Sequence, residues 1–107
     1  MAIEATLQKK LPANCITLPF GAKEITTVAV CSGGAGQKVF AQAVDNGVDL
    51  YISGEATDIY QAARDAKINV IFAGHYATET VGVKALAEIL KQGFSVETFF
   101  IDSPTGL

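Results

Sequence analysis

The sequence alternates between short apolar runs and longer segments with helical periodicity, and this alternation limits the possible folds more than any other feature. The apolar runs cover residues 25–31, 48–53, 68–73 and 96–101. The periodic segments cover residues 37–46, from 56 or 57 to 66, and 78–92. Helical crossovers join neighbouring parallel strands, so this order predicts an α/β fold with a mainly parallel sheet.

The predicted architecture is a three-layer sandwich around a sheet of four strands or slightly more. Residues 25–31 are rich in β-branched side chains and apolar at their end, which predicts a strand buried on both faces. Residues 96–101 could run either parallel or antiparallel at an edge, so a mixed sheet is also compatible. Gly47 and Gly93 are expected to end the helices before them.

The first part of the chain gives weaker signals. Residues 2–11 are expected to form a short helix, with Ile3, Leu7 and Leu11 on one side and Pro12 at its end. Residues 13–24 are predicted to form a loop, or a short edge strand around residues 16–18.

Composition excludes several classes of protein. The 107 residues predict one α/β domain over 1–107, and 50% hydrophobic residues suffice for a packed core. The net charge of -3 without a basic run makes a nucleic-acid partner unlikely. No apolar run approaches the roughly 20 residues that span a bilayer, and no signal segment is visible, so we expect a cytoplasmic protein. Cys15 and Cys31 are expected to be reduced thiols.

Three loops are expected to meet where the first three strands end, because the carboxyl ends of parallel strands share one edge. These loops contain His75, which is the only histidine, together with Glu79 and Glu55. One imidazole and two carboxylates suit a divalent transition metal such as zinc, manganese or iron. Two alternatives stay open: His75 could bond to backbone, and Glu55 could belong to the acidic first turn of a helix.

The glycine-rich loop after the first strand is a candidate anion or phosphate site, because it presents backbone amides near a helix N-terminus. The candidate ligand-binding residues are Ser32, Gly33, Gly34 and Gly36. The loop matches neither a Walker motif nor a full dinucleotide fingerprint. A tight strand-to-helix turn would require the same glycines, so this alternative also stays open.

Four segments together resemble a known family. They are Val-Ala-Val-Cys-Ser-Gly-Gly at 28–34, Asp-Leu-Tyr-Ile-Ser-Gly-Glu at 49–55, Ala-Gly-His-Tyr-Ala-Thr-Glu at 73–79 with Gly-Val-Lys-Ala-Leu at 82–86, and Phe-Ile-Asp-Ser-Pro at 100–104. Their order and spacing resemble the C-terminal half of the Ngg-interacting-factor-three-like proteins, also called GTP cyclohydrolase 1 type 2 homologues or dinuclear-metal-centre hexameric proteins. The match runs from about Thr27 to residue 107.

The resemblance implies a metal site and an assembly. His75 and Glu79 match two metal ligands of the family, and Glu55 matches a glutamate near the metal cavity. Family members form hexamers, so a homo-oligomer is expected. The implied activity is metal-dependent hydrolysis of a nucleotide or another phosphorylated or cyclic small molecule.

The chain also departs from the family, since it lacks the paired histidines and the aspartate of the other half. The dinuclear site is therefore incomplete, and we expect the chain to be inactive alone. The chain could be a truncated half, a second chain could supply the missing ligands, or the site could have decayed.

Two hypotheses for the function follow. In the first, the chain is part of a metal-dependent hydrolase, with Glu55 as general base or as the residue that orients the metal site. The other is a non-catalytic binding or assembly module with an anion-binding glycine loop.

Overall fold

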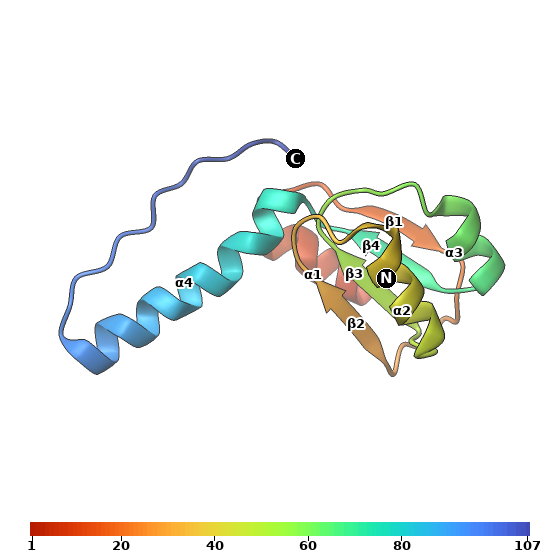
Figure 1. The fold of residues 1–107 in the computed structure, drawn as a ribbon, viewed down its shortest axis with the longest axis horizontal. Coiled ribbons are helices and arrows are strands. Elements are labelled where there is room, and N and C mark those ends of the chain that lie inside the picture. The colour runs from red at the N-terminus through yellow and green to blue at the C-terminus, as the bar shows by residue number, and fades with distance from the viewer.

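The computed structural model describes all residues from 1 to 107, and it has an α/β fold with a four-stranded mixed sheet (Figure 1). The elements are α1 (Ala2–Lys10), β1 (Ile16–Pro19), β2 (Val28–Cys31), α2 (Gly36–Asp45), β3 (Leu50–Ser53), α3 (Tyr60–Ala66), β4 (Asn69–Phe72) and α4 (His75–Phe94). The strand order is β1-β4-β3-β2. Strands β2, β3 and β4 are parallel, and β1 pairs antiparallel with β4.

The sheet has helices on both faces, which confirms the predicted sandwich. One face packs against α2 and α3 through residues such as Phe40, Ala63 and Val70. The other face, which includes Leu50 and Ile71, packs against α1 through its apolar side. Every residue of the two central strands, β3 and β4, is buried. The core therefore lies around the strands that lead into the loops of residues 54–59 and 73–74.

Strand β2 differs from its prediction. It is an edge strand rather than a strand buried on both faces, and its residues alternate between exposed and half-buried. Val30 is 70% exposed. A run of β-branched residues fits a central and an edge strand equally well, so the composition of the run could not decide its place in the sheet.

The prediction of a strand at residues 96–101 is wrong, because this segment pairs with no other strand. The fourth strand of the sheet is β1. It lies where the sequence predicted either a loop or a short edge strand around residues 16–18. Helix α4 also begins earlier than predicted, at His75, and runs through Gly93 to Phe94. It ends where Ser95 adopts the left-handed conformation, with a φ of 50°. Helix α3 begins later than predicted, at Tyr60.

The second half of α4 and the segment after it project away from the sheet (Figure 1). We call residues 81–101 the arm. Within α4 only Ala77 and Thr80 are buried, and both lie before the arm. The radius of gyration is 15.4 Å, whereas a compact chain of this length has about 13 Å. Although α4 has 20 residues, no helix combines the length and apolar character needed to cross a membrane.

The end of the chain returns to the start of α4. The Tyr76 hydroxyl donates to Asp102 Oδ1 at 2.6 Å and accepts a hydrogen bond from the Ser103 N–H at 2.7 Å. The Tyr76 N–H donates to the carbonyl of Leu107 at 3.2 Å. The hydrogen bond to Asp102 raises the pKa of Tyr76. Both ends of the arm are thus held beside the sheet, and its middle is not.

One carboxylate fixes the start of β2 against the start of β3. Asp49 Oδ2 accepts four hydrogen bonds of 2.8–3.1 Å, from the N–H and hydroxyl groups of Thr26 and Thr27. The hydrogen bonds of Thr26 and then Thr27 lower the pKa of Asp49 to about 2. The fold therefore favours the ionised form of this carboxyl group.

We expect Asp49→Asn to lower the melting temperature at neutral pH. Because the folded pKa is lowered, the carboxylate stabilises the fold fully above its unfolded pKa of about 4. That contribution is lost as the pH falls from about 4 towards 2, so the difference between the two proteins should shrink across this range. Thermal unfolding of both proteins, followed by circular dichroism between pH 2 and pH 7, measures this difference in melting temperature. A difference that stays constant down to pH 2 would contradict a role for the charge.

Candidate functional site

Three loops meet at the carboxyl ends of β2, β3 and β4, and hydrogen bonds join them. The Glu55 N–H donates to the Gly33 carbonyl at 2.8 Å, and the Gly74 N–H donates to the Gly54 carbonyl at 2.9 Å. The Gly33 N–H donates to the Thr78 hydroxyl at 2.9 Å, and this hydroxyl donates to the Gly74 carbonyl at 2.9 Å. The first turn of α4 is thus fixed against both neighbouring loops, and the side chains on these loops have a defined arrangement.

Gly54 lies where these loops approach each other most closely. A Cβ atom at this position would lie 2.5 Å from the Gly33 carbonyl oxygen and 2.6 Å from the Thr78 hydroxyl. No real Cβ atom lies that close to a neighbour, so only glycine fits between the two. The loop that begins with Gly54 therefore has a packing role in addition to carrying Glu55.

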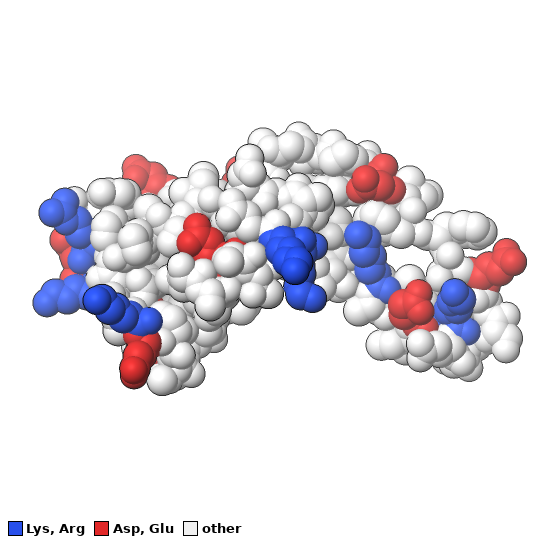
Figure 2. Space-filling model, turned by 180° about the vertical axis from the view of Figure 1, so that it is seen from behind, with Lys and Arg blue, Asp and Glu red and all other residues white.

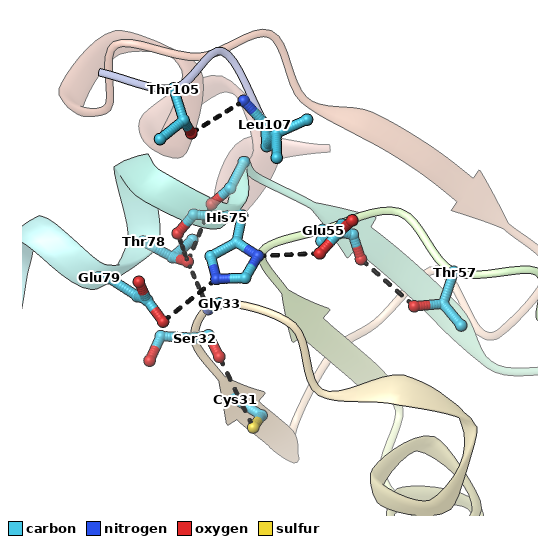
Figure 3. Close-up of polar contacts among 11 residues, drawn as sticks. Cys31, Ser32, Gly33, Glu55, Thr57, His75, Thr78, Glu79, Thr105 and Leu107 are labelled. Atoms are coloured by element: carbon cyan, nitrogen blue, oxygen red, sulfur yellow. Dashed lines mark hydrogen bonds and ion pairs between the residues drawn. The ribbon is translucent and has the colours of Figure 1, made fainter. Parts of the chain in front are cut away.

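The structure brings together the three side chains predicted to form a site (Figure 3). His75 is the first residue of α4, after Gly74 leaves the strand with a φ of 89°. The His75 Nδ1 atom lies 2.8 Å from Glu55 Oε2, and its Nε2 atom lies 3.4 Å from Glu79 Oε1. Glu79 lies one helical turn after His75 and faces the same side. The imidazole is therefore held between two carboxylates.

The electrostatics of the site follow from this geometry. The hydrogen bond with Glu55 raises the pKa of His75, and the charge of Glu79 acts in the same direction against an opposing effect of burial. The side chains of His75, Glu55 and Glu79 are 34%, 48% and 54% exposed. The site is open to solvent, so an ion or another molecule can reach it.

The glycine loop lies against these side chains. A Cβ atom on Gly33, which has a φ of 69°, would collide with Glu79 Oε1, and one on Gly34 would lie 3.2 Å from both His75 Cε1 and Glu55 Oε2. Gly36 lies apart, with nothing within 4 Å of such an atom. The Ser32 carbonyl accepts only a long contact of 3.9 Å from Cys31 Sγ.

Gly33 and Gly34 leave room for the imidazole and the carboxylates. The Gly33 N–H is already donated to Thr78, and two carboxylates lie beside the loop. Both features oppose the binding of an anion there. The anion-binding role of Ser32, Gly33, Gly34 and Gly36 stays a prediction, and this geometry supports the alternative of a tight turn more directly.

The donor atoms fit two positions of a metal centre. Ligands at about 2.1 Å from a tetrahedral ion lie roughly 3.4 Å apart, and 3.4 Å separates His75 Nε2 from Glu79 Oε1. Glu55 contacts the other ring nitrogen and so lies on the far side of the imidazole. No group of three or more His, Cys, Asp or Glu residues in the chain is arranged to hold a metal ion.

Sequence reasoning missed two residues around the site. Thr78 joins the glycine loop to α4, and Tyr76 holds the returning end of the chain. Both lie within the Gly-His-Tyr-Ala-Thr-Glu segment, but nothing in their spacing shows which distant backbone groups they bind.

A cavity of about 600 Å³ lies beside the start of α4. The residues that line it include Ala13, Glu55, Phe72, Tyr76, Asp102 and Leu107.

The fold and this site define the class of protein. It is an α/β protein whose site, at the carboxyl ends of parallel strands, holds a histidine between two carboxylates, one from a loop and one from the first turns of a helix. The sequence profile of the Duf34/NIF3 (NGG1p interacting factor 3) family matches residues 2–106. The chain belongs to this family, which confirms the resemblance seen in the sequence.

Curated relatives support the same assignment. The chain is 48% identical over 107 residues to a "GTP cyclohydrolase 1 type 2 homolog" of Pyrococcus horikoshii, and 47% identical over 110 aligned positions to a protein of the same name from Halobacterium salinarum. These alignments cover 98% and 99% of this chain but only 42% and 43% of the relatives. The chain thus spans less than half of their length.

Solved structures share the fold. TTHA1606 from Thermus thermophilus is 32% identical and superposes with a TM-score of 0.89, over 100% of this chain and 43% of its own. HcgD from Methanocaldococcus jannaschii is 26% identical, with a TM-score of 0.74 over 90% of this chain and 40% of its own. The superposition on TTHA1606 includes the arm, because it covers the whole chain.

Proposed function

We propose that this chain supplies two ligands, His75 and Glu79, to a divalent metal centre in a hydrolase-type protein. The observation that carries the proposal is the 3.4 Å separation of His75 Nε2 and Glu79 Oε1, with Glu55 on the other ring nitrogen. Zinc, manganese and iron are the candidate ions, because imidazole and carboxylate ligands suit all three.

Each residue has a separate task in this proposal. A neutral His75 donates its Nδ1–H to Glu55, which fixes the tautomer and leaves the Nε2 lone pair free for the ion. Glu79 offers one carboxylate oxygen beside Nε2. Thr78 and the glycine loop hold the first turn of α4 in place, so both donors keep their spacing. The metal, when bound, would supply an acidic water as a nucleophile. Glu55 contacts Nδ1 on the far side of the ring, which supports the orienting task rather than that of a general base.

The remaining ligands must come from another polypeptide segment. Catalytic zinc sites use about three protein ligands, so two should hold an ion weakly. The name of the relatives points to a nucleotide as the substrate class, and this extends to the present chain only as part of the proposal. Alone, the chain is expected to turn over little substrate. The homo-oligomer implied by the resemblance likewise stays a prediction.

Metal binding tests the proposal. We expect His75→Ala to weaken binding of zinc or manganese by more than about 100-fold, because loss of an outer partner of a ligand already costs roughly 10–100-fold. Glu79→Gln should also weaken binding strongly, and Glu55→Gln should do so by about 10–100-fold. Isothermal titration with each ion measures these affinities.

The matched control for this experiment is Glu88→Gln, which makes the same change on an exposed position of α4. It should leave metal affinity unchanged. Equal affinity of His75→Ala and the unmodified chain, or an equal loss in Glu88→Gln and Glu79→Gln, would overturn the proposal. The chain would then be better described as an assembly module, a function that the uncovered arm favours independently.

A further inference from the structure

The arm exposes side chains of the kind that normally fill a protein core. In α4, six large apolar residues of the arm are at least 38% exposed, namely Val81, Val83, Leu86, Ile89, Leu90 and Phe94. In the extended segment after it, Phe99 is 82% and Ile101 is 85% exposed. Such residues are seldom left in water as a contiguous group unless they form an interaction surface.

The part of the arm after α4 also has a backbone without partners. Residues 96–101 make no backbone hydrogen bonds in the structure. They present six residues of extended chain whose N–H and C=O groups are free, like an open sheet edge. Such a segment can join another sheet as an added strand, in which the backbone supplies the hydrogen bonds and alternate side chains enter the partner's surface.

The exposed area matches what an interface requires. The chain exposes 7146 Å², whereas a compact monomer of 11.2 kDa exposes about 5,700 Å². The excess of about 1,400 Å² exceeds the roughly 800 Å² that each partner contributes to a standard interface. Figure 2 shows side chains of both charges along the helix of the arm. The segment that returns from it contains two acidic residues, Glu97 and Asp102, and no basic one.

The same arm exists in a protein more than twice as long. The TM-score of 0.89 to TTHA1606 covers the whole of this chain, including the arm, but only 43% of that protein. The projecting shape is therefore shared with a structure in which more than half of the chain lies outside the match. The arm could be covered by a second copy of this chain or by the part of the relatives that this chain does not span. The second possibility explains more directly why the longer protein has the same arm.

We propose that the arm is a docking surface for a second α/β body, namely a polypeptide equivalent to the unmatched part of the relatives. Residues 96–101 join the sheet of that body as a strand, and the apolar side of α4 packs against it. Helix α4 begins at His75, carries Glu79 one turn later and continues into the arm. The docked body therefore lies on the same helix as the two proposed metal ligands. The docking goes beyond the proposed metal chemistry and needs no metal, so the two proposals can fail separately.

A binding experiment tests the docking. The part of the Pyrococcus horikoshii relative outside the matched 42% is co-expressed with the full chain as a separate polypeptide. The result expected is a 1:1 complex by size-exclusion chromatography with light scattering. Phe99→Glu should weaken the complex by about 30-fold or more, because buried aromatic side chains dominate interface energies. The control is Val30→Glu, which introduces the same side chain at a 70% exposed position outside the arm, and it should bind normally.

Hydrogen exchange gives a second measurement. The amides of residues 96–101 should exchange near the rate of an unstructured chain when the protein is alone, and about 100-fold or more slowly in the complex. If the separate polypeptide does not fold, the same segment is fused to the N-terminus of the full chain, and the arm amides of the soluble fusion should be protected.

Three outcomes would overturn the docking proposal. One is an unprotected arm in the soluble fusion. Another is a complex that Phe99→Glu and Val30→Glu weaken equally. The third is a homodimer of this chain that protects the arm when the second polypeptide is absent. If Val30→Glu abolished that homodimer, the arm would lie on the β2 edge of a second copy.

Discussion

Replacing Asn69 with aspartate is expected to destabilise the protein by about 3 kcal/mol or more. Asn69 begins β4 and is 2% exposed. Its Nδ2 group donates to the carbonyls of Ala22 and Asp49 at 2.8 and 3.2 Å, and its Oδ1 accepts the Gly21 N–H at 3.0 Å. Aspartate has the same shape but no donor when ionised, so Asn69→Asp places a buried carboxylate against two carbonyl oxygens.

The free energy of unfolding in urea, followed by circular dichroism, measures this loss. Asn46→Asp is the matched control, because Asn46 makes the same kind of hydrogen bond, from Nδ2 to the Gln42 carbonyl at 2.7 Å, at an exposed position. A negative charge at the C-terminal end of α2 costs about 0.3–1 kcal/mol. Losses of similar size in the two variants would show that Asn69 does not hold residues 21–22 against the sheet.

Replacing Gly54 with alanine is expected to cost about 2–3 kcal/mol and to disturb the strand-end site. The added methyl group would lie 2.5 Å from the Gly33 carbonyl oxygen, and backbone cannot move aside as the end of a flexible side chain can. The glycine loop must therefore shift, and the hydrogen bond from Gly33 to Thr78 is lost with it. We expect weaker metal binding together with the lower stability, although Gly54 is not one of the proposed ligands.

Gly82→Ala is the control for this steric effect. Gly82 lies in α4, and a Cβ atom there would have nothing within 4 Å. Alanine in the middle of a helix is favoured over glycine by about 1 kcal/mol, so Gly82→Ala should be neutral or stabilising. Urea unfolding and metal titration of both variants give the comparison. A Gly54→Ala protein as stable as the unmodified chain would mean that the loops can separate at little cost.

Much of the layered core could be predicted from periodicity. The helix at Ala2–Lys10 packs with Ile3, Leu7 and Leu11 against the sheet, as their spacing predicted. Gly47 follows α2 with a φ of 65°, in the left-handed conformation expected after a helix. Both features depend on residues close together in the chain, which is why local patterns suffice for them.

The errors arise where a distant partner decides the structure. Residues 96–101 have the composition of a strand, but a strand needs a neighbour, and no edge within this chain accepts them. Strand β2 looks central by composition and is exposed because nothing pairs with its outer edge. The meeting of His75, Glu79 and Glu55 could be predicted from topology alone. The bond between Thr78 and Gly33 could not, since it depends on the exact separation of two loops.

The unpaired segment of the arm has a consequence for the protein's behaviour in concentrated solution. Residues 96–101 combine high β-propensity with a single charge, and they contain neither proline nor glycine. Short segments of this composition stack into cross-β fibres when they are left uncovered. On the proposed docking, a chain made in excess over the polypeptide that covers its arm is therefore expected to aggregate.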